Sequence, residues 1–280
     1  MKRVLTVQDI SCIGRCSLTV ALPIISAMGI ETAVLPTAVL SNHTAFENGF
    51  TFRDLTDDLD GILAHWKKDN FKFDAIYTGY LGSIKQISIV ETIFKDFADK
   101  NQLKIVDPAM ADGGKLYKGF DDEYAREMAS LCASADIILP NLTEVCILTS
   151  TPYREDFTKD EIKAMLKKLS DAGTPLVIMT GATEGKDKLG VLSYRKTDDS
   201  WHEYYGERME HFFHGTGDVF ASCLTGAFTR GADIDTAIKI AVEFVVDSIK
   251  KTEADEDRVW YGVNFEQAIP KLISMLGILK

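Results

Sequence analysis

The chain is organised around the stretch His-Gly-Thr-Gly-Asp-Val-Phe at residues 214–220, which an apolar run to Arg230 follows. Apolar residues recur there at helical spacing, which predicts a turn that enters a buried helix. Gly215 and Gly217 have no Cβ, so the backbone can turn its N–H groups toward a ligand. The helix N-terminus adds unpaired N–H groups and positive dipole character. We call residues 215–217 the cradle, and they predict an anion site suited to phosphate.

Asp218 stands at the mouth of this cradle. A carboxylate repels a phosphate, but it can accept the proton of an alcohol that attacks the phosphate. A plainer structure is also open, in which Gly-Thr-Gly-Asp is a tight turn and Asp218 is the N-cap of the helix. Aspartate is common in both places, so the motif alone does not distinguish the two interpretations.

The length allows one large α/β domain or two modest ones, and 46% hydrophobic and 26% charged residues are ordinary for a soluble globular protein. The sequence shows no internal repeat or linker, so we expect one domain over residues 1–280. The net charge of −11 argues against general nucleic-acid binding, although a local cradle can still hold an anionic substrate. The five cysteines, Cys12 and Cys16 among them, fit no zinc or disulfide spacing. We therefore expect reduced thiols and a cytoplasmic protein. The apolar runs are too short for a signal peptide or a membrane helix, so no membrane partner is expected.

Short apolar runs alternate with helical patterns along most of the chain, which is typical of βαβ units. We expect an α/β fold with a mainly parallel central sheet, helices on both faces and a small antiparallel hairpin at the sheet edge. The predicted strands are Arg3–Gln8, Glu31–Leu40, Ala75–Thr78, Lys104–Val106, Ile137–Leu139 and Leu176–Thr180, and the hairpin pairs Gly190–Arg195 with Trp201–Tyr205. The predicted helices are Leu18–Met28, Asp54–Lys68, Ile84–Asn101, Asp121–Ser134, Asn141–Leu148, Lys159–Ala172, Gly217–Arg230, Ile234–Lys250 and Phe265–Leu276.

Three connecting segments are polar or rich in glycine. Asp9–Ser17 is a predicted loop, and a second loop starts at Ser41 and runs past Gly49. Ala111–Gly119 carries three glycines and little apolar content, which predicts a mobile loop.

The predicted strands end in polar or glycine residues. In a parallel sheet, ligands bind beyond the carboxyl ends of the strands. Caps and turns also belong at strand ends, which is the plainer interpretation of each residue alone. The convergence of these residues on one edge with Asp218 favours a binding site. They are Gln8-Asp9, Gly79-Tyr80, Asp107, Asn141 with Glu144, and Thr180-Gly181.

Several short motifs connect these strand ends to a known family. In chain order they are Ser41-Asn42-His43-Thr44, Thr78-Gly79-Tyr80-Leu81-Gly82, Asp107-Pro108, Pro140-Asn141 with Glu144, and Gly215-Thr216-Gly217-Asp218. From Val4 to about Lys250, the chain resembles the pyridoxal kinases, the vitamin B6 kinases of the ribokinase-like superfamily. The resemblance implies a ribokinase-like fold. It also implies transfer of the γ-phosphoryl group of ATP to the 5′-hydroxymethyl group of pyridoxal, pyridoxine or pyridoxamine.

The resemblance implies a catalytic role for the cradle and Asp218. Asp218 is the implied general base. The amides of Gly215, Thr216 and Gly217 are implied to stabilise charge on the transferring phosphoryl group.

The resemblance also assigns binding roles. Mg²⁺ is held directly or through water by Asp107 and Glu144. The nucleotide is contacted by Asp112, Tyr117, Asn141, Thr180 and Thr216. The vitamer is contacted by Asp9, Ser11, His43, Thr44 and Tyr80, and the loop Ala111–Gly119 closes over the site. The implied cofactors are ATP and Mg²⁺, with the need for a monovalent cation such as K⁺ left open, and the implied assembly is a homodimer.

Two features depart from the pyridoxal kinase pattern, the residue after the first-strand glutamine and the loop Ile10–Ser17 that follows it. Those enzymes usually carry serine directly after the first-strand glutamine, where this chain has Asp9. An aspartate there is similar to hydroxymethylpyrimidine kinases of thiamine synthesis, which keeps that activity open as an alternative. A sugar or nucleoside kinase is a third candidate, and a non-catalytic sensor of a vitamer or nucleotide is the alternative outside the enzymes. An intact Asp218 argues against a sensor, because binding alone needs no base.

Overall fold

The computed structural model describes residues 1–211 and 213–278. Within these residues, nine strands form one sheet in the order β11-β10-β9-β8-β5-β4-β1-β2-β3, and β6 and β7 form a separate hairpin. The strands are β1 (Arg3–Ile13), β2 (Glu31–Asn42), β3 (Phe52–Asp54), β4 (Ala75–Thr78), β5 (Leu103–Val106), β6 (Ala111–Asp112), β7 (Lys115–Leu116), β8 (Ile137–Ile138), β9 (Leu176–Glu184), β10 (Lys188–Arg195) and β11 (Ser200–Glu207). The helices are α1 (Leu18–Ala27), α2 (Thr56–Lys68), α3 (Ile84–Asp96), α4 (Asp122–Ala133), α5 (Leu142–Leu148), α6 (Lys159–Asp171), α7 (Thr216–Arg230), α8 (Ile234–Glu253) and α9 (Phe265–Met275).

The centre of the sheet is parallel and both of its edges are antiparallel. Strands β2, β1, β4, β5, β8 and β9 pair in parallel. The hairpin β10–β11 adds to β9, and β3 adds to β2, each in antiparallel register. The fold class and the edge hairpin predicted from the sequence are therefore confirmed.

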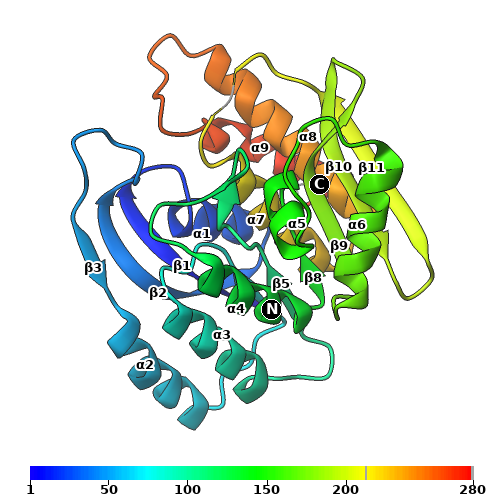
Figure 1. Ribbon diagram of the computed structural model, residues 1–280. Helices are drawn as coiled ribbons and strands as arrows, with labels where there is room; N and C mark the ends of the chain where they lie inside the picture. The colour runs from blue at the N-terminus through cyan, green and yellow to red at the C-terminus, as the bar shows by residue number, and fades with distance from the viewer. Residues whose placement is uncertain (212, 279–280) are drawn as a thin grey trace.

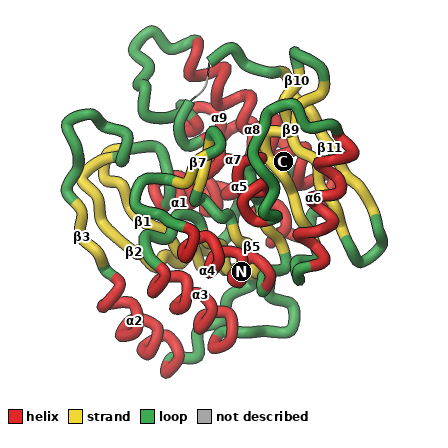
Figure 2. Tube along the Cα trace, viewed as in Figure 1, coloured by secondary structure: helices red, strands yellow, loops and turns green. Residues whose placement is uncertain are grey.

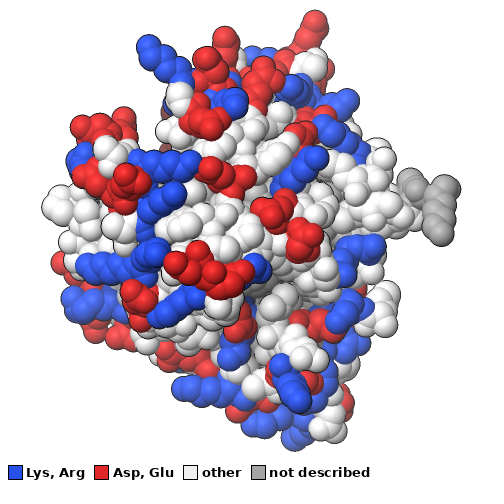
Figure 3. Space-filling model, turned by 90° about the vertical axis from the view of Figure 1, so that its right-hand side faces the viewer, with Lys and Arg blue, Asp and Glu red and all other residues white. Residues whose placement is uncertain are grey.

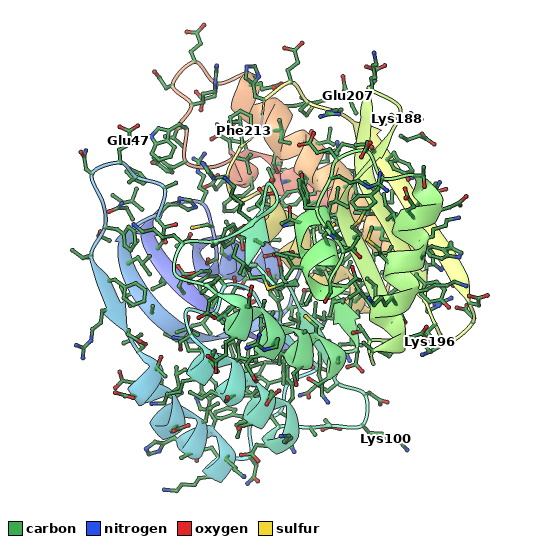
Figure 4. All side chains as sticks on the ribbon, viewed as in Figure 1. Glu47, Lys100, Lys188, Lys196, Glu207 and Phe213 are labelled. Carbon is green, nitrogen blue, oxygen red and sulfur yellow. The ribbon has the colours of Figure 1, made fainter. Side chains whose placement is uncertain are left out.

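Helices cover both faces of the sheet (Figure 1). Helices α2 to α6 pack on one face, and α1, α7, α8 and α9 pack on the other. Strand β4 illustrates the division, because Ile76 belongs to the first core and its neighbour Tyr77 to the second. In Figure 4, Glu47 and Phe213 lie toward the carboxyl end of the parallel strands, while Lys100 and Lys196 lie toward the opposite end.

Several predicted boundaries were wrong. Strand β1 continues to Ile13, where the sequence predicted a loop from Asp9, and its register with β2 extends to the pair Ile13–Asn42. Asp9 and Ser11 are polar, yet both are buried and hydrogen-bonded to each other, which hid the strand. Helix α3 ends at Asp96, well before Asn101.

Three short strands lie in or beside predicted loops. Strand β3 lies beyond the loop that starts at Ser41, and it is only three residues long. The segment Ala111–Gly119 contains the hairpin β6–β7, of which Figure 2 labels β7. Strand β9 extends past Thr180 to Glu184, and the turn of its neighbouring hairpin lies between Arg195 and Ser200.

Helix α7 has the buried character that its sequence predicts, since most of its length is apolar or small and enclosed. Its N-cap is Gly215, and Asp218 is the third helical residue, with no side-chain capping bond at this end. The interpretation of Asp218 as an N-cap is therefore wrong. The carboxylate does not cap α7.

Among the described residues, no helix combines the length and apolar character needed to cross a membrane. On the face that carries β10, β11 and α6, acidic and basic side chains are interspersed (Figure 3). Ion pairs such as Lys188–Glu184 and Lys159–Glu203 join the two signs there.

Candidate active site

The cradle is shaped by contacts that only glycine permits. Gly215 has φ of +76°, and a Cβ there would lie 1.9 Å from the carbonyl oxygen of Arg15. The first helical bond runs from the Val219 amide to the Gly215 carbonyl at 3.0 Å. The amides of residues 216–218 therefore precede the helical ladder, which leaves them outside the intrahelical bonds of α7. A Cβ on Gly217 would meet nothing within 4 Å, so open space adjoins the cradle at this residue.

Asp218 has the electrostatic character of a base. Burial, and then the negative charge of Asp9, raise the pKa of its carboxyl to about 7. The backbone N–H of Ser17 donates a hydrogen bond to the carboxylate, which opposes the rise. A pKa near the working pH suits general base catalysis, because the group is both available and able to hold the proton.

Ser17 joins Asp218 to Asp9, a link that the sequence did not predict. Its backbone has φ of +49°, and its amide reaches Asp218 while its hydroxyl bonds Asp9. The hydroxyl of Ser11 also donates to Asp9, at 3.3 Å. Asp9 is 4% exposed, and this burial raises the pKa of its carboxyl. The two aspartates thus face one region between β1 and α7.

Glu144 anchors a neighbouring part of the site. Its two carboxylate oxygens accept hydrogen bonds from the backbone amides of Met110 and Asn141, each at 2.9 Å. The Asn141 side chain accepts from the Glu144 amide at 3.0 Å and donates to the Ala111 carbonyl at 2.8 Å. This capping box begins α5 and holds the segment that leads into β6. Burial raises the pKa of the Glu144 carboxyl to about 7.

Asp107 lies among negative charges. Burial raises the pKa of its carboxyl well above the usual range, and the charges of Glu144 and Asp218 add to the rise. The amide of Ala109 donates to it at 3.1 Å. Within residues 1–211 and 213–278, no group of three or more His, Cys, Asp or Glu side chains is arranged to hold a metal ion. Mutual repulsion between these carboxylates nevertheless fits a divalent cation whose remaining oxygen ligands come from phosphates and water.

The hairpin β6–β7 brings Asp112 and Tyr117 to the same region. The Tyr117 amide donates to the Met110 carbonyl at 2.8 Å, which ties the hairpin to the Glu144 anchor. Burial raises the pKa of the Tyr117 hydroxyl, and the charges of Glu144, Asp112, Asp107 and Asp218 raise it further. Tyr117 therefore lies within electrostatic reach of the acidic groups on both sides of the site. The residue is 40% exposed, so it lies at the surface of the site.

A second group of residues gathers near Asp9. Burial raises the pKa of the Tyr80 hydroxyl, and the charge of Asp9 adds to the effect. His43 packs beside His214, with ring centroids 5.0 Å apart, and burial lowers its pKa. A Cβ on Gly14 would lie 3.2 Å from His43 and 3.4 Å from Ser11, so these two residues adjoin one another.

The three predicted threonines lie in different parts of the fold. Thr44 is exposed in the loop after β2. Thr180 lies on β9, and its amide donates to the Pro140 carbonyl at 2.9 Å, one residue before Asn141. Thr216 begins α7, with its hydroxyl 3.3 Å from the Phe213 carbonyl. The structure thus gathers Asp9, Ser11, Tyr80, Asp107, Asp112, Tyr117, Asn141, Glu144 and Asp218 around the carboxyl edge.

Tyr77 was not predicted for the site, although it lies directly beneath it. Its side chain is fully buried, and burial raises the pKa of its hydroxyl, with the charges of Asp218 and Asp107 adding to the rise. The side chains of Ser222 and Gln8 lie within hydrogen-bonding reach of this hydroxyl and oppose the rise.

The fold and the site together define a class. A parallel sheet with its acidic carboxyl edge facing a glycine cradle, and a base of raised pKa at the helix N-terminus, is the machinery of a small-molecule kinase. The sequence pattern of the phosphomethylpyrimidine kinase family matches residues 25–259, and the chain belongs to that family.

Individual relatives agree with this membership. A pyridoxal kinase of Dictyostelium discoideum is 27% identical over 267 residues, which cover 89% of this chain and 86% of the relative. A crystal structure of a Bacteroides thetaiotaomicron protein, assigned as a phosphomethylpyrimidine kinase and crystallised with pyridoxal, is 41% identical with a TM-score of 0.92 and covers 97% of this chain and 95% of that one. A pyridoxal kinase structure from Lactobacillus plantarum is 28% identical with a TM-score of 0.90 and covers 98% of both chains. The resemblance to pyridoxal kinases predicted from the motifs is confirmed.

Proposed function

We propose that this chain transfers the γ-phosphoryl group of ATP to the 5′-hydroxymethyl group of a vitamin B6 vitamer. The observation that carries the proposal is the position of Asp218, whose pKa is raised to about 7 beside the amides of the cradle. Relatives named pyridoxal kinase, and a relative that was crystallised with pyridoxal, support the choice of alcohol.

The chemistry follows from groups of this chain. Asp218 accepts the proton of the vitamer hydroxyl as its oxygen attacks phosphorus. The amides of the cradle donate to the transferring phosphoryl oxygens, where negative charge concentrates. Tyr117 and the hairpin around Asp112 cover the phosphates and exclude water, so that transfer to water is suppressed. Asn141 and Thr180 complete the nucleotide side.

Asp107 and Glu144 are the proposed residues for Mg²⁺. Asp107 is the better direct ligand, because both oxygens of Glu144 already accept backbone hydrogen bonds. Glu144 then acts through water and holds the neighbouring backbone in place. The ion would neutralise phosphate charge that these carboxylates would otherwise repel.

Asp9, Ser11, His43, Thr44 and Tyr80 form the proposed vitamer side. Asp9 can pair with a protonated pyridine nitrogen or with a substrate amine, so we expect pyridoxamine to be favoured. Comparing kcat/KM for pyridoxal and pyridoxamine in the wild type and in Asp9→Ser tests this. The variant should lose the preference for the amine, and an unchanged ratio would remove Asp9 from substrate choice.

Hydroxymethylpyrimidine kinase is the second candidate. Asp9 in place of the usual serine and the family to which the chain belongs both favour it. The site chemistry would be the same, with a pyrimidine methanol in place of the pyridine. A non-catalytic sensor is disfavoured, since a base of raised pKa has no use in binding alone.

A substrate panel distinguishes these functions. ATP consumption is measured with pyridoxal, pyridoxine, pyridoxamine, hydroxymethylpyrimidine and ribose, each against a reaction that lacks the alcohol. The proposal predicts turnover above background with at least one B6 vitamer. Turnover with hydroxymethylpyrimidine alone would establish the second candidate, and tight vitamer binding without any turnover would establish a sensor.

We also propose that residues 1–280 act as one domain in a cytoplasmic homodimer. Light scattering coupled to gel filtration would give twice the 31.1 kDa chain mass for the dimer. A monomer mass at micromolar concentration would contradict it. The requirement for K⁺ is tested by replacing it with a tetraalkylammonium salt in the same assay.

A further inference from the structure

Three aromatic rings form a continuous stack beside the proposed vitamer side. Phe120 lies parallel to Tyr124, with ring centroids 3.8 Å apart and an interplanar angle of 4°. On its other side Phe120 stacks on Tyr80, with centroids 5.5 Å apart and an angle of 27°. Tyr80 follows β4 and Tyr124 lies in α4, so the stack joins segments that are far apart in sequence.

The stack is fixed to the strand end from which Tyr80 projects. The Tyr124 hydroxyl donates to the carbonyl of Leu81 at 2.6 Å, and Tyr124 is buried. Phe120 is therefore held between α4 and the segment that carries Tyr80. Phe120 covers one face of the Tyr80 ring, so a ligand ring could stack only on the opposite face. Aromatic pairs prefer such offset stacking, so Phe120 restricts the ring orientations open to Tyr80.

The same short segment reaches the phosphate side of the site. Tyr117 precedes Phe120 by three residues, and its amide donates to the Met110 carbonyl at 2.8 Å, next to the segment that Glu144 holds. The Phe120 amide donates to the Tyr117 carbonyl at 3.1 Å and closes this turn. Gly119, with φ of +97°, lies inside it. A displacement of Tyr117 by nucleotide phosphates must therefore move or restrain Phe120.

We infer that Phe120 is a positioning residue that orients Tyr80 for the vitamer ring and couples vitamer binding to nucleotide binding through the Tyr117–Phe120 turn. This inference rests on the proposed function. It adds a residue to which the sequence motifs assign no role, and it gives the hairpin segment a part in substrate recognition as well as in covering the phosphates.

The effect of removing the ring follows from the strength of one aromatic contact. Loss of a stacked pair weakens the restraint on Tyr80 by an amount that corresponds to roughly 3- to 10-fold in affinity. Phe120→Ala should therefore raise the Kd and the KM for pyridoxal by that factor. The Kd for nucleotide should change less than about twofold, because the cradle is untouched.

The test measures pyridoxal binding to the full chain by calorimetry, with and without a non-hydrolysable ATP analogue and Mg²⁺. The wild type should bind pyridoxal more tightly when the analogue is present. Phe120→Ala should bind it more weakly and lose the tightening, while Phe120→Tyr, which keeps the ring, should retain both. Phe120→Leu carries the same test if the alanine variant does not fold, because it keeps apolar volume without a ring.

Tyr153→Ala is the matched control. Tyr153 packs over the hairpin, since a Cβ on Gly114 would lie 2.6 Å from its ring, but it takes no part in the stack. It should loosen the hairpin without changing the affinity for pyridoxal alone. Equal losses in Tyr153→Ala and Phe120→Ala, or wild-type binding and coupling in Phe120→Ala, would overturn the inference. Failure of the wild type to bind any vitamer would overturn the proposed function and this inference together.

Discussion

Replacing Asp218 by asparagine should stabilise the folded protein at neutral and alkaline pH. The folded state raises the pKa of this carboxyl to about 7, whereas an unfolded chain releases the proton near pH ~4. Between these values the folded state holds a proton that the unfolded state has lost. The free energy of unfolding of the wild type therefore falls as pH rises from ~4 to ~7 and stays low above that. The asparagine side chain of the variant does not titrate, so this loss is absent from it.

The magnitude follows from the same pKa. At ~1.4 kcal/mol for each pH unit, the full effect is about 4 kcal/mol. The carboxylate keeps some contact with solvent, so we expect roughly 2–4 kcal/mol in favour of Asp218→Asn at pH 8, and near zero at pH 4. The Ser17 amide can still donate to the asparagine carbonyl, so the substitution removes charge with little change in contacts.

Urea unfolding without ligands, followed by circular dichroism at pH 4, 6 and 8, measures this difference. Asp198→Asn is the matched control, because hydrogen bonds from Arg195 and Ser200 lower the pKa of that exposed carboxyl. The sign of its pH dependence should be opposite, with the wild type favoured once pH exceeds ~4. A difference between Asp218→Asn and the wild type that stays constant with pH would refute the assignment of a raised pKa to Asp218.

Three further outcomes are expected. Gly217→Ala should fold with unchanged or slightly greater stability, because the added Cβ meets no neighbour within 4 Å. Its kcat should fall at least roughly tenfold, because the methyl group would occupy the phosphoryl position, and full activity in a steady-state assay would contradict this. Glu144→Gln should lower the free energy of unfolding by about 1–3 kcal/mol, because one backbone amide then faces an NH₂ group. Amide hydrogen exchange should become faster at Met110 and Asn141, and unchanged exchange would show that the capping box does not hold the hairpin. The value of kcat/KM should fall on the acid side of about pH 7, where Asp218 is protonated. Asp9→Asn should move this acid limb to lower pH, because the charge of Asp9 helps to raise the pKa of Asp218. An acid limb that does not move would show that Asp9 does not affect the pKa of Asp218.

The sequence predicted the parts of the fold that depend on local pattern. The alternation of strands and helices predicted the parallel sheet, and Gly215 and Gly217 predicted the turn that enters α7. The pair Asn141 and Glu144 carried the signature of a helix cap, and the structure confirms a capping box. The same bonds leave Glu144 less free to bind metal than its residue type suggested.

Other features depend on contacts that no local pattern encodes. Ser17 reaches Asp218 through its backbone amide, which every residue except proline has, so its residue type gave no signal. Asp9 and Ser11 satisfy each other inside an extended strand, which made that strand resemble a loop. The contact of Phe120 with Tyr80 spans forty residues of sequence and required the packing of α4 against the end of β4.

Formation of the vitamer 5′-phosphate by the wild type and by Asp218→Asn tests most directly whether Asp218 is the base of phosphoryl transfer to the vitamer. Both proteins are supplied with saturating ATP, Mg²⁺ and pyridoxal, and the phosphate ester is quantified by mass spectrometry together with ADP. The wild type should form one ester for each ADP, and the variant should form it at a rate roughly 10²–10⁴-fold lower while still binding ATP. Equal rates in the two proteins would contradict the role of Asp218 as the base, and ADP formed without an ester would contradict transfer to the vitamer.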